Sequence, residues 1–254
     1  MTSEPTLALV GGTGLTELED HADALDLDTP YGLPSAPIRV MDTAPLRLLF
    51  LPRNGSPHRF PPHLLNYRDN LWALKEAGAG QVLALSAVGG ITDAYGPRSL
   101  AAPDQLIDYS WGREHSYSDS EHVPLVHVDF TNPYEGPLRR ALLHSADRIG
   151  LELVDGGCIG VFQGPRLESA AEIEKARRDG CDMAGMTSLP EAGLARELGL
   201  DYAGIAVVSN WGAGVGDDLI SEDDIAETLR EPMSRVRALL KALVQTLSNS
   251  DQAS

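Results

Sequence analysis

Gly11-Gly12-Thr13-Gly14 is the first segment of the chain whose residue types could do chemistry, and it follows an apolar run at residues 6–10. Glycines let the backbone bend so that several N–H groups point inward, and the Thr13 hydroxyl adds a donor, which suits phosphate. The same residues also fit an ordinary strand-to-helix turn that needs positive φ. The pattern is neither Gly-x-Gly-x-x-Gly nor a Walker A motif, because no Gly-Lys-Ser/Thr follows, so NAD and ATP are poor candidates.

Donors of the same kind stand at the ends of other apolar runs. They are Arg53 and Asn54 after residues 46–51, Ser86 and Ala87 at the end of residues 81–86, and Thr187 just before a predicted helix start at Pro190. Arg53 can place paired N–H donors on a phosphate, although each of these residues alone also fits a surface turn. Because ligands of open α/β sheets collect at the carboxyl ends of the strands, we expect these residues to form one anion site.

Two further polar residues could recognise a flat ligand. Glu168 follows a Gly-Pro turn, and Asn210 ends the apolar run at residues 202–209. Asparagine offers both a donor and an acceptor, whereas an ionised glutamate only accepts, so together they can read the edge of a heterocycle. Glu168 alone would also fit a solvated acid at a helix start.

Other catalytic and metal sites lack support in the sequence. The seven histidines include no His-x-x-x-His or His-Glu-x-x-His pair, so no metal site is expected. Ser86 lacks the Gly-x-Ser-x-Gly elbow of serine hydrolases, and no carboxylate pair stands out as a glycosidase couple. Cys158 and Cys181 fit no zinc pattern and are expected to be buried small apolar side chains.

An α/β architecture is predicted to position these residues. Apolar runs predict strands at residues 6–10, 46–51, 81–86, 105–107, 157–162 and 202–209, and helices are predicted at residues 66–77, 137–149, 169–178, 190–198 and 221–247. Ser221 lies three residues before Asp224, which is typical of a capped helix start. Alternating strands and helices predict a sheet with helices on both faces.

No repeat or linker divides the chain, so a single domain over residues 1–254 is expected, with frayed ends at 1–5 and 248–254. Long loops are expected at residues 30–37 and 111–129.

The net charge of the chain limits the classes of partner that it is expected to bind. The 254 residues hold 37 Asp and Glu against 20 Lys and Arg, a formal net charge of −17. Such a surface disfavours nucleic acid and anionic lipid, and no run of roughly 20 apolar residues or signal-peptide core is present, so a cytoplasmic protein is expected. Phosphate can still bind, because salt screens the acidic surface within about 10 Å while local donors act directly. The acidic excess is therefore expected on the solvated surface.

Five ordered blocks of the sequence resemble the purine nucleoside phosphorylase family in its methylthioadenosine phosphorylase branch. The blocks are residues 58–63 (HRFPPH), 66–75 (NYRDNLWALK), 86–90 (SAVGG), 164–168 (GPRLE) and 185–191 (GMTSLPE). The resemblance covers nearly the whole chain. It implies a phosphorylase/hydrolase-like α/β sandwich with a central mixed sheet, and an assembly that is usually a homotrimer. It also implies a reaction in which phosphate attacks C1′ of a purine nucleoside and releases the free base and a sugar 1-phosphate.

The resemblance also assigns roles to individual residues. Phosphate is held in the family at the positions of Thr13, Arg53, Asn54, Ser86, Ala87 and Thr187, with a histidine usual in place of Asn54. Met186 falls where the family packs the ribosyl ring, Leu167 flanks the purine, and Asn210 contacts purine N7. His127 matches a histidine that reaches the 5′ pocket of a neighbouring subunit. No cofactor and no metal are implied, because inorganic phosphate is the co-substrate and nucleophile.

Base preference follows from three positions. The adenosine-specific branch has aspartates where this chain has Asn210 and Gly212, and Glu168 falls where 6-oxopurine phosphorylases carry a glutamate. A carboxylate accepts the N1 proton of a 6-oxopurine, so hypoxanthine or guanine is expected over adenine. The likeness is greatest to members that act on methylthioinosine, although Glu222 falls near an apolar position of the 5′ pocket. The alternatives are a general inosine/guanosine phosphorylase, a methylthioadenosine phosphorylase, or a non-catalytic nucleoside-binding protein, which Asn54 makes conceivable.

Overall fold

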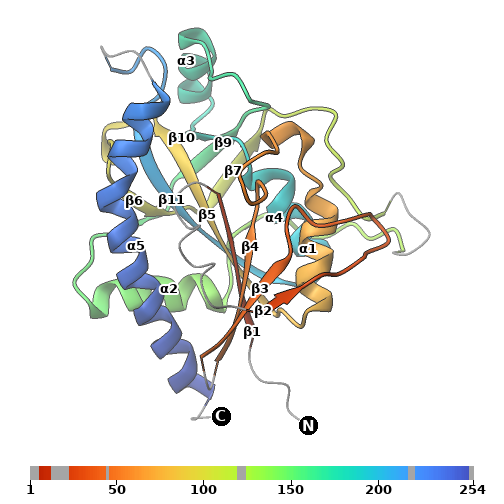
Figure 1. Cartoon of the computed structure of the whole chain (residues 1–254). Helices are drawn as coiled ribbons and strands as arrows, with labels where there is room; N and C mark the ends of the chain where they lie inside the picture. Colours follow the sequence, from red (N-terminus) through yellow and green to blue (C-terminus); the bar gives the residue numbers. More distant parts are fainter. Residues whose placement is uncertain (1–5, 13–22, 44–45, 119–123, 217–220, 252–254) are drawn as a thin grey trace.

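The computed structural model of the chain describes residues 6–12, 23–43, 46–118, 124–216 and 221–251. Within them, one mixed sheet contains strands that range from residue 6 to residue 211 (Figure 1). Its centre consists of parallel strands in the order β4 (Leu46–Pro52), β1 (Thr6–Gly11), β5 (Gln81–Gly90) and β11 (Asp201–Trp211). These apolar strands are buried on both faces, as expected where helices cover each side of a parallel sheet.

Shorter strands extend the sheet on both sides. β2 (Asp23–Leu25) and β3 (Ile38–Thr43) form an antiparallel ribbon beside β4. β10 (Met183–Gly185) pairs antiparallel with the end of β5 and parallel with β9 (Cys158–Val161), which pairs with β7 (Gln105–Asp108). β6 (Leu100–Ala102) lies against β11, and β8 (Val154–Asp155) lies against β6. The six predicted strands are confirmed; the ribbon and the strands β6, β8 and β10 were missed, because their segments are short or partly polar.

The helices lie close to their predicted positions, except that the last one continues through residues 248–251, which were expected to be part of a frayed end. They are α1 (Tyr67–Glu76), α2 (Pro137–Arg148), α3 (Ala170–Arg178), α4 (Ser188–Glu197) and α5 (Glu222–Asp251), with short 3-10 helices at Pro62–Leu64 and Asp93–Tyr95. Local caps fix their starts: Ser169 and Glu172 form a reciprocal capping box before α3, and Ser221 Oγ accepts from the Asp224 N–H before α5. The described parts of the two long predicted loops contain no helix or extended strand.

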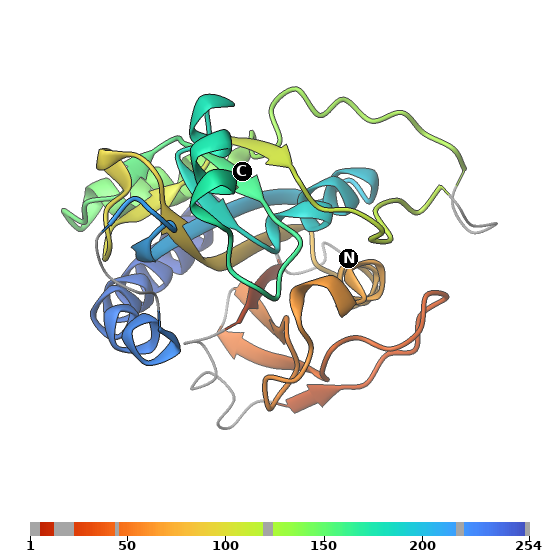
Figure 2. The same ribbon diagram turned by 90° about the horizontal axis from the view of Figure 1, so that it is seen from above.

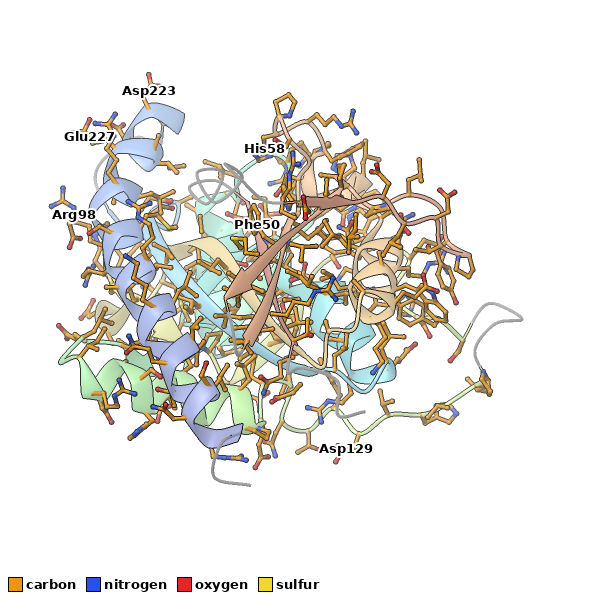
Figure 3. All side chains as sticks on the ribbon, turned by 60° about the horizontal axis from the view of Figure 1, so that its bottom comes forward. Phe50, His58, Arg98, Asp129, Asp223 and Glu227 are labelled. Atoms are coloured by element: carbon orange, nitrogen blue, oxygen red, sulfur yellow. The ribbon has the colours of Figure 1, made fainter. Side chains whose placement is uncertain are left out.

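Helices cover the two faces of the central sheet in pairs. α2 packs on α5 against one face, and α1 packs on α4 against the other (Figures 1 and 2). Alternate residues of β5 divide between these layers: Leu83 and Leu85 join the α2–α5 core, while Val82 and Ala84 join the α1–α4 core. Figure 3 shows Asp223 and Glu227 pointing outward from the start of α5. Among the described acidic residues, Asp69 and Glu191 are the buried ones, so the acidic excess lies on the surface as expected.

One edge of β5 has a stretch without a neighbouring strand, and this opening in the sheet adjoins the candidate site. β1 pairs with β5 as far as Val10 and Ala84, and β10 joins the same edge of β5 at Gly89. Between these contacts, the described residues leave the β5 edge from Leu85 to Val88 without a neighbouring strand. The opposite edge of β5 continues to pair with β11, where a bulge lies between Val208 and Asn210.

Candidate functional site

A cavity of about 470 Å³ lies beside this opening. Its walls come from the end of β5, the loop after β4, the segment before α3, the β10–α4 turn, the end of β11 and the start of α5. The carboxyl ends of several strands thus supply the walls, which is where ligands bind in open α/β sheets. The sequence-predicted residues that line it are Arg53, Asn54, Ser86, Ala87, Leu167, Glu168, Met186, Thr187, Asn210 and Gly212.

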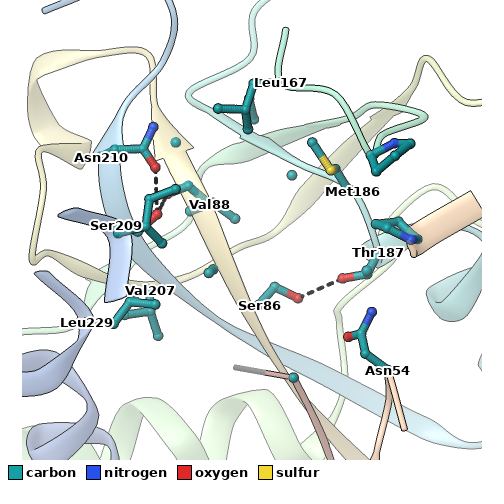
Figure 4. Close-up of a pocket in the computed structure, with 18 of the residues that line it drawn as sticks. Asn54, Ser86, Val88, Leu167, Met186, Thr187, Val207, Ser209, Asn210 and Leu229 are labelled. Atoms are coloured by element: carbon teal, nitrogen blue, oxygen red, sulfur yellow. Dashed lines mark hydrogen bonds between the residues drawn. The ribbon is translucent and has the colours of Figure 1, made fainter. Parts of the chain in front are cut away.

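Hydroxyl and backbone donors gather at one end of the cavity. The Ser86 and Thr187 hydroxyl oxygens lie 3.3 Å apart and face the cavity together (Figure 4). The Leu85 carbonyl points into the sheet opening, where Arg53 Nη1 donates to it at 2.8 Å. Backbone groups of alternate strand residues point to the same side, so the Ala87 N–H also points into the opening. These neutral donors can bind an anion such as phosphate.

The paired N–H donors of Arg53 do not face the cavity as the sequence predicted. Its Nε and Nη2 atoms donate to both oxygens of Glu191 at 2.7 and 2.8 Å, and both side chains are buried. Burial opposes the charge of Arg53, but the Glu191 carboxylate outweighs that cost and raises the pKa of the arginine. The paired donors therefore bind Glu191 and not phosphate, which corrects the predicted forked contact. Arg53 still lines the cavity, and Nη1 carries a second hydrogen beyond the one given to Leu85.

Glu191 is the residue that the sequence analysis missed at this end. Its Oε1 also accepts from the Tyr202 hydroxyl at 2.9 Å, so the buried carboxylate accepts three hydrogen bonds in all. An acid in the first turn of a helix gave no sign of burial, because such residues are usually solvated. Its effect is to hold Arg53 rigidly across the end of β1.

Asn54 occupies the position where the family usually has histidine. Its side-chain amide donates to the Phe60 carbonyl at 2.8 Å, while its backbone carbonyl accepts from the N–H groups of Arg59 and Phe60. Asn54 thereby shapes the turn after β4 as well as lining the cavity. A Cβ atom at Gly12 would lie 3.0 Å from Asn54 Oδ1, so the two segments fit closely.

Amide and carboxylate groups lie at another part of the cavity. The Ser209 hydroxyl donates to Asn210 Oδ1 at 2.7 Å, and Asn210 Nδ2 donates to the Trp211 carbonyl at 2.7 Å, which leaves a second amide hydrogen for a ligand. Glu168 Oε1 is buried and has no hydrogen-bond partner among the described residues. Burial raises the pKa of Glu168, and the neighbouring Glu172 adds to the shift. A buried acceptor without a partner is costly, so the carboxylate is suited to accept from a ligand.

Gly212 has a steric reason to be glycine. A Cβ atom there would lie 3.2 Å from the Gly90 carbonyl oxygen and 3.3 Å from two carbon atoms of Ile173, and the Gly212 N–H donates to the same carbonyl at 2.7 Å. An aspartate at this position would force its neighbours to shift. The backbone here therefore disfavours the second carboxylate of the adenosine-specific pattern.

Apolar side chains form the remaining wall. Val207 of β11 and the α5 residues Ile225, Leu229 and Met233 line the cavity, and Figure 4 shows Val207 beside Leu229 below Ser209. Val207 and Leu229 are almost completely buried. Sequence reasoning missed this wall, because the periodic apolar residues of α5 look like ordinary core residues.

Three sequence-predicted features do not contribute to the described cavity. Thr13 lies outside the described residues, and so does the side chain of Glu222. His127 is exposed on the segment before α2 and does not line the cavity of its own chain. Within the described ranges, no cluster of three His, Cys, Asp or Glu residues could hold a metal ion, and no helix is long and apolar enough to cross a membrane.

Comparison with known proteins identifies the family. The model of the phosphorylase superfamily matches residues 6–245. The chain belongs to the phosphorylase superfamily. Relatives of this phosphorylase include a probable S-methyl-5′-thioinosine phosphorylase of Xanthomonas campestris, 52% identical over 225 residues that cover 88% of this chain and 89% of the relative. A 6-oxopurine nucleoside phosphorylase of Pyrococcus furiosus is 36% identical over 246 residues, covering 94% and 92%.

The fold of the phosphorylase is also that of solved members. A methylthioadenosine phosphorylase of Schistosoma mansoni in complex with adenine superimposes with a TM-score of 0.91 at 27% identity, covering 96% of this chain and 92% of that one. The predicted α/β sandwich with a central mixed sheet is therefore confirmed. The protein is an enzyme of the nucleoside phosphorylase type, a pentosyltransferase.

Proposed function

We propose that this phosphorylase converts S-methyl-5′-thioinosine and phosphate into hypoxanthine and 5-methylthioribose 1-phosphate. One observation carries the proposal: a single cavity joins the Ser86–Thr187 hydroxyl pair, the Asn210 amide and the Glu168 carboxylate, whose buried Oε1 has no described partner. The hydroxyl pair suits phosphate, and the amide and carboxylate suit the edge of a 6-oxopurine. Relatives named for methylthioinosine and for 6-oxopurine nucleosides support the same assignment.

The proposed reaction needs no side-chain nucleophile. Phosphate attacks C1′ through an oxocarbenium-like transition state, as in glycoside hydrolysis, and the C1′–N9 bond breaks with its electron pair passing to the purine. Ser86, Thr187 and the Ala87 N–H hold phosphate in line with the bond. The free hydrogen of the Asn210 amide donates to N7, a contact that strengthens as negative charge develops on the base.

The apolar wall supports the methylthio group over a hydroxyl. Val207, Ile225 and Leu229 offer no polar partner for a 5′-hydroxyl, whereas a thioether methyl is stabilised by burial among such side chains. Met186 lines the cavity next to Thr187, across from Val207 and Leu229 (Figure 4), and we expect the ribosyl ring to pack against it. A general inosine phosphorylase would be expected to place a polar group at the 5′ end.

The assembly and setting follow from the family resemblance. We propose a homotrimer in which the exposed His127 reaches the 5′ pocket of a neighbouring subunit, which a mass of three chains in solution would test. The enzyme acts in the cytoplasm in purine salvage, and it uses inorganic phosphate as co-substrate without a cofactor or metal.

The test measures hypoxanthine release from methylthioinosine and from inosine, each with and without phosphate. The proposal predicts release from methylthioinosine that depends strictly on phosphate, with slower release from inosine. Equal turnover of both nucleosides would indicate a general phosphorylase, and no turnover of either would indicate a binding protein.

A variant pair separates the phosphate subsite from general stability. Thr187→Val is expected to raise the phosphate KM by about fivefold, because one neutral hydrogen bond of ~1 kcal/mol is lost while the shape of the side chain is kept. Ser145→Ala removes a buried hydroxyl that bonds Ala141 and Thr246 outside the cavity, and it should leave the phosphate KM unchanged. Equal phosphate KM values in both variants would contradict the assignment of Thr187.

A further inference from the structure

Arg113 is a buried cation that no expected role explains. It follows β7 and is 8% exposed. Its Nη2 donates to the carbonyls of Phe162 and Gln163, both at 2.9 Å, and its Nη1 donates to those of Met186 and Leu189 at 2.8 and 2.7 Å. Its Nε lies 3.3 Å from Gln163 Oε1, so all three nitrogens have partners.

The partners of Arg113 are unusual for a buried charge. No carboxylate of the described residues lies within ion-pair distance of its guanidinium, whereas Arg53 is paired with Glu191. Burial lowers the pKa of Arg113, and the nearby Tyr67 and Asp108 offset part of that shift. Its planar fork holds four carbonyl groups that follow the ends of two strands, β9 and β10. A buried cation is costly, so its retention here points to the geometry that it imposes.

The two segments that Arg113 joins carry opposite ends of the cavity. Phe162 and Gln163 lead directly into the segment with Leu167 and Glu168, whereas Met186 and Leu189 enclose Thr187. An independent observation shows how closely the segments meet. A Cβ atom at Gly164, whose φ is +60°, would lie 2.7 Å from Met186 Sδ. Small shifts between the segments would therefore change the distance from the carboxylate to the hydroxyl pair.

We infer that Arg113 is a positioning residue that fixes the purine-binding segment relative to the phosphate-binding turn. It touches neither substrate, and it acts by holding the Gln163 and Met186 carbonyls on one rigid guanidinium. Base and phosphate binding are then coupled, because a ligand that orders one segment also orders the other through the shared guanidinium, which lowers the cost of binding the second ligand. The inference deepens the proposed function and rests on it.

Two substitutions at Arg113 separate shape from charge. Arg113→Met removes both, and Arg113→Lys keeps the charge but offers one nitrogen, which cannot span four carbonyls. Both should lower kcat/KM for methylthioinosine by on the order of 100-fold, the effect of misplacing reacting groups by about 1 Å. Arg139→Met is the matched control, because Arg139 donates to the Ala102 and Pro103 carbonyls away from this cavity.

The decisive readout is the coupling between the ligands, measured by calorimetry. In the wild-type enzyme, hypoxanthine should tighten phosphate binding, and in both Arg113 variants that tightening should be lost while phosphate alone binds within threefold of wild type. A merely structural role would lower the Tm of the Arg113 variants and of Arg139→Met alike, with coupling and kcat/KM within threefold of wild type. That result would overturn the inference, as would an Arg113→Lys enzyme with wild-type coupling.

The experiment also separates a failure of the proposed function from a failure of the positioning role of Arg113. Should Arg113→Met fail to fold, Arg113→Lys decides the question alone. A wild-type enzyme that releases no base overturns the proposed function and this inference together. An active wild-type enzyme whose coupling survives both substitutions overturns the positioning role of Arg113 and leaves the proposed function intact.

Discussion

Replacing Glu168 with glutamine should weaken the preference of the enzyme for 6-oxopurines. Glu168 Oε1 is buried at the cavity without a described partner, and an ionised carboxylate can only accept a hydrogen bond. Hypoxanthine presents an N–H donor at N1, whereas adenine presents an acceptor there. The glutamine amide keeps the size of the side chain but can turn a donor toward N1.

The expected size of the effect has two contributions. Loss of a hydrogen bond to a charged group costs ~1.5–3 kcal/mol, which lowers kcat/KM for methylthioinosine by ~10–150-fold. A neutral bond from the glutamine amide to adenine N1 contributes ~0.5–1.5 kcal/mol, which raises kcat/KM for methylthioadenosine by ~2–12-fold. The ratio of kcat/KM for methylthioinosine to kcat/KM for methylthioadenosine should therefore fall by ~20–2,000-fold.

The pH dependence gives a second signature of the same carboxylate. Because burial raises the pKa of Glu168, its acceptor form is lost as pH falls through that raised value. The wild-type ratio of methylthioinosine to methylthioadenosine turnover should therefore decrease toward acid pH, and the Glu168→Gln ratio should stay flat. Parallel assays of both nucleosides from pH 5 to pH 9 test this. A Glu168→Gln enzyme that keeps the wild-type ratio and its pH profile would refute the role of Glu168.

Three other substitutions test separate parts of the structure. Asn54→His should lower the phosphate KM by ~3–10-fold near pH 6, where a protonated imidazole puts a cationic donor in place of a neutral one, as initial rates at varied phosphate would show. Val207→Thr puts a hydroxyl into the apolar wall at constant volume, so the preference for methylthioinosine over inosine should shrink by about tenfold. Asp69 has a pKa raised from 3.8 to about 6 by burial and by Asp28 and Glu76, against a hydrogen bond from Thr29. The native state thus binds more protons than the unfolded state, and stability should fall by up to ~3 kcal/mol between pH 4 and pH 7, a loss absent from Asp69→Asn in urea unfolding.

Each of these expectations has a contrary result. An unchanged phosphate KM in Asn54→His would mean that this side chain serves the turn after β4 and not the ligand. An unchanged nucleoside ratio in Val207→Thr would place the 5′ group elsewhere. Parallel stability curves for wild type and Asp69→Asn would show that the Asp69 carboxylate keeps an ordinary pKa.

Long apolar runs made the central sheet predictable, whereas its edges were not. β1, β4, β5 and β11 are apolar on both faces, which is what a parallel sheet under two helical layers requires. β10 has three residues, and its antiparallel pairing with β5 depends on contacts across nearly a hundred residues. The opening between β1 and β10 follows from that pairing, so no local pattern reports it.

The site was predictable where residue types stand at strand ends. The sequence indicated Ser86, Thr187, Asn210 and Glu168, and the structure brings them to one cavity. The prediction that the paired N–H donors of Arg53 bind phosphate was wrong, because they bind the buried Glu191, which lies 138 positions further along the chain. Arg113 was also missed, since its partners are backbone carbonyls, which no side-chain pattern records.

A competition assay measures directly which purine nucleoside the enzyme prefers. Equal concentrations of methylthioinosine and methylthioadenosine are mixed with the wild-type enzyme and phosphate near pH 8, and the hypoxanthine and adenine released are measured together. Their initial ratio equals the ratio of kcat/KM values. Hypoxanthine should exceed adenine by at least ~100-fold, because the edge of a 6-aminopurine does not match the Glu168 carboxylate. Adenine released faster than hypoxanthine would contradict this expectation.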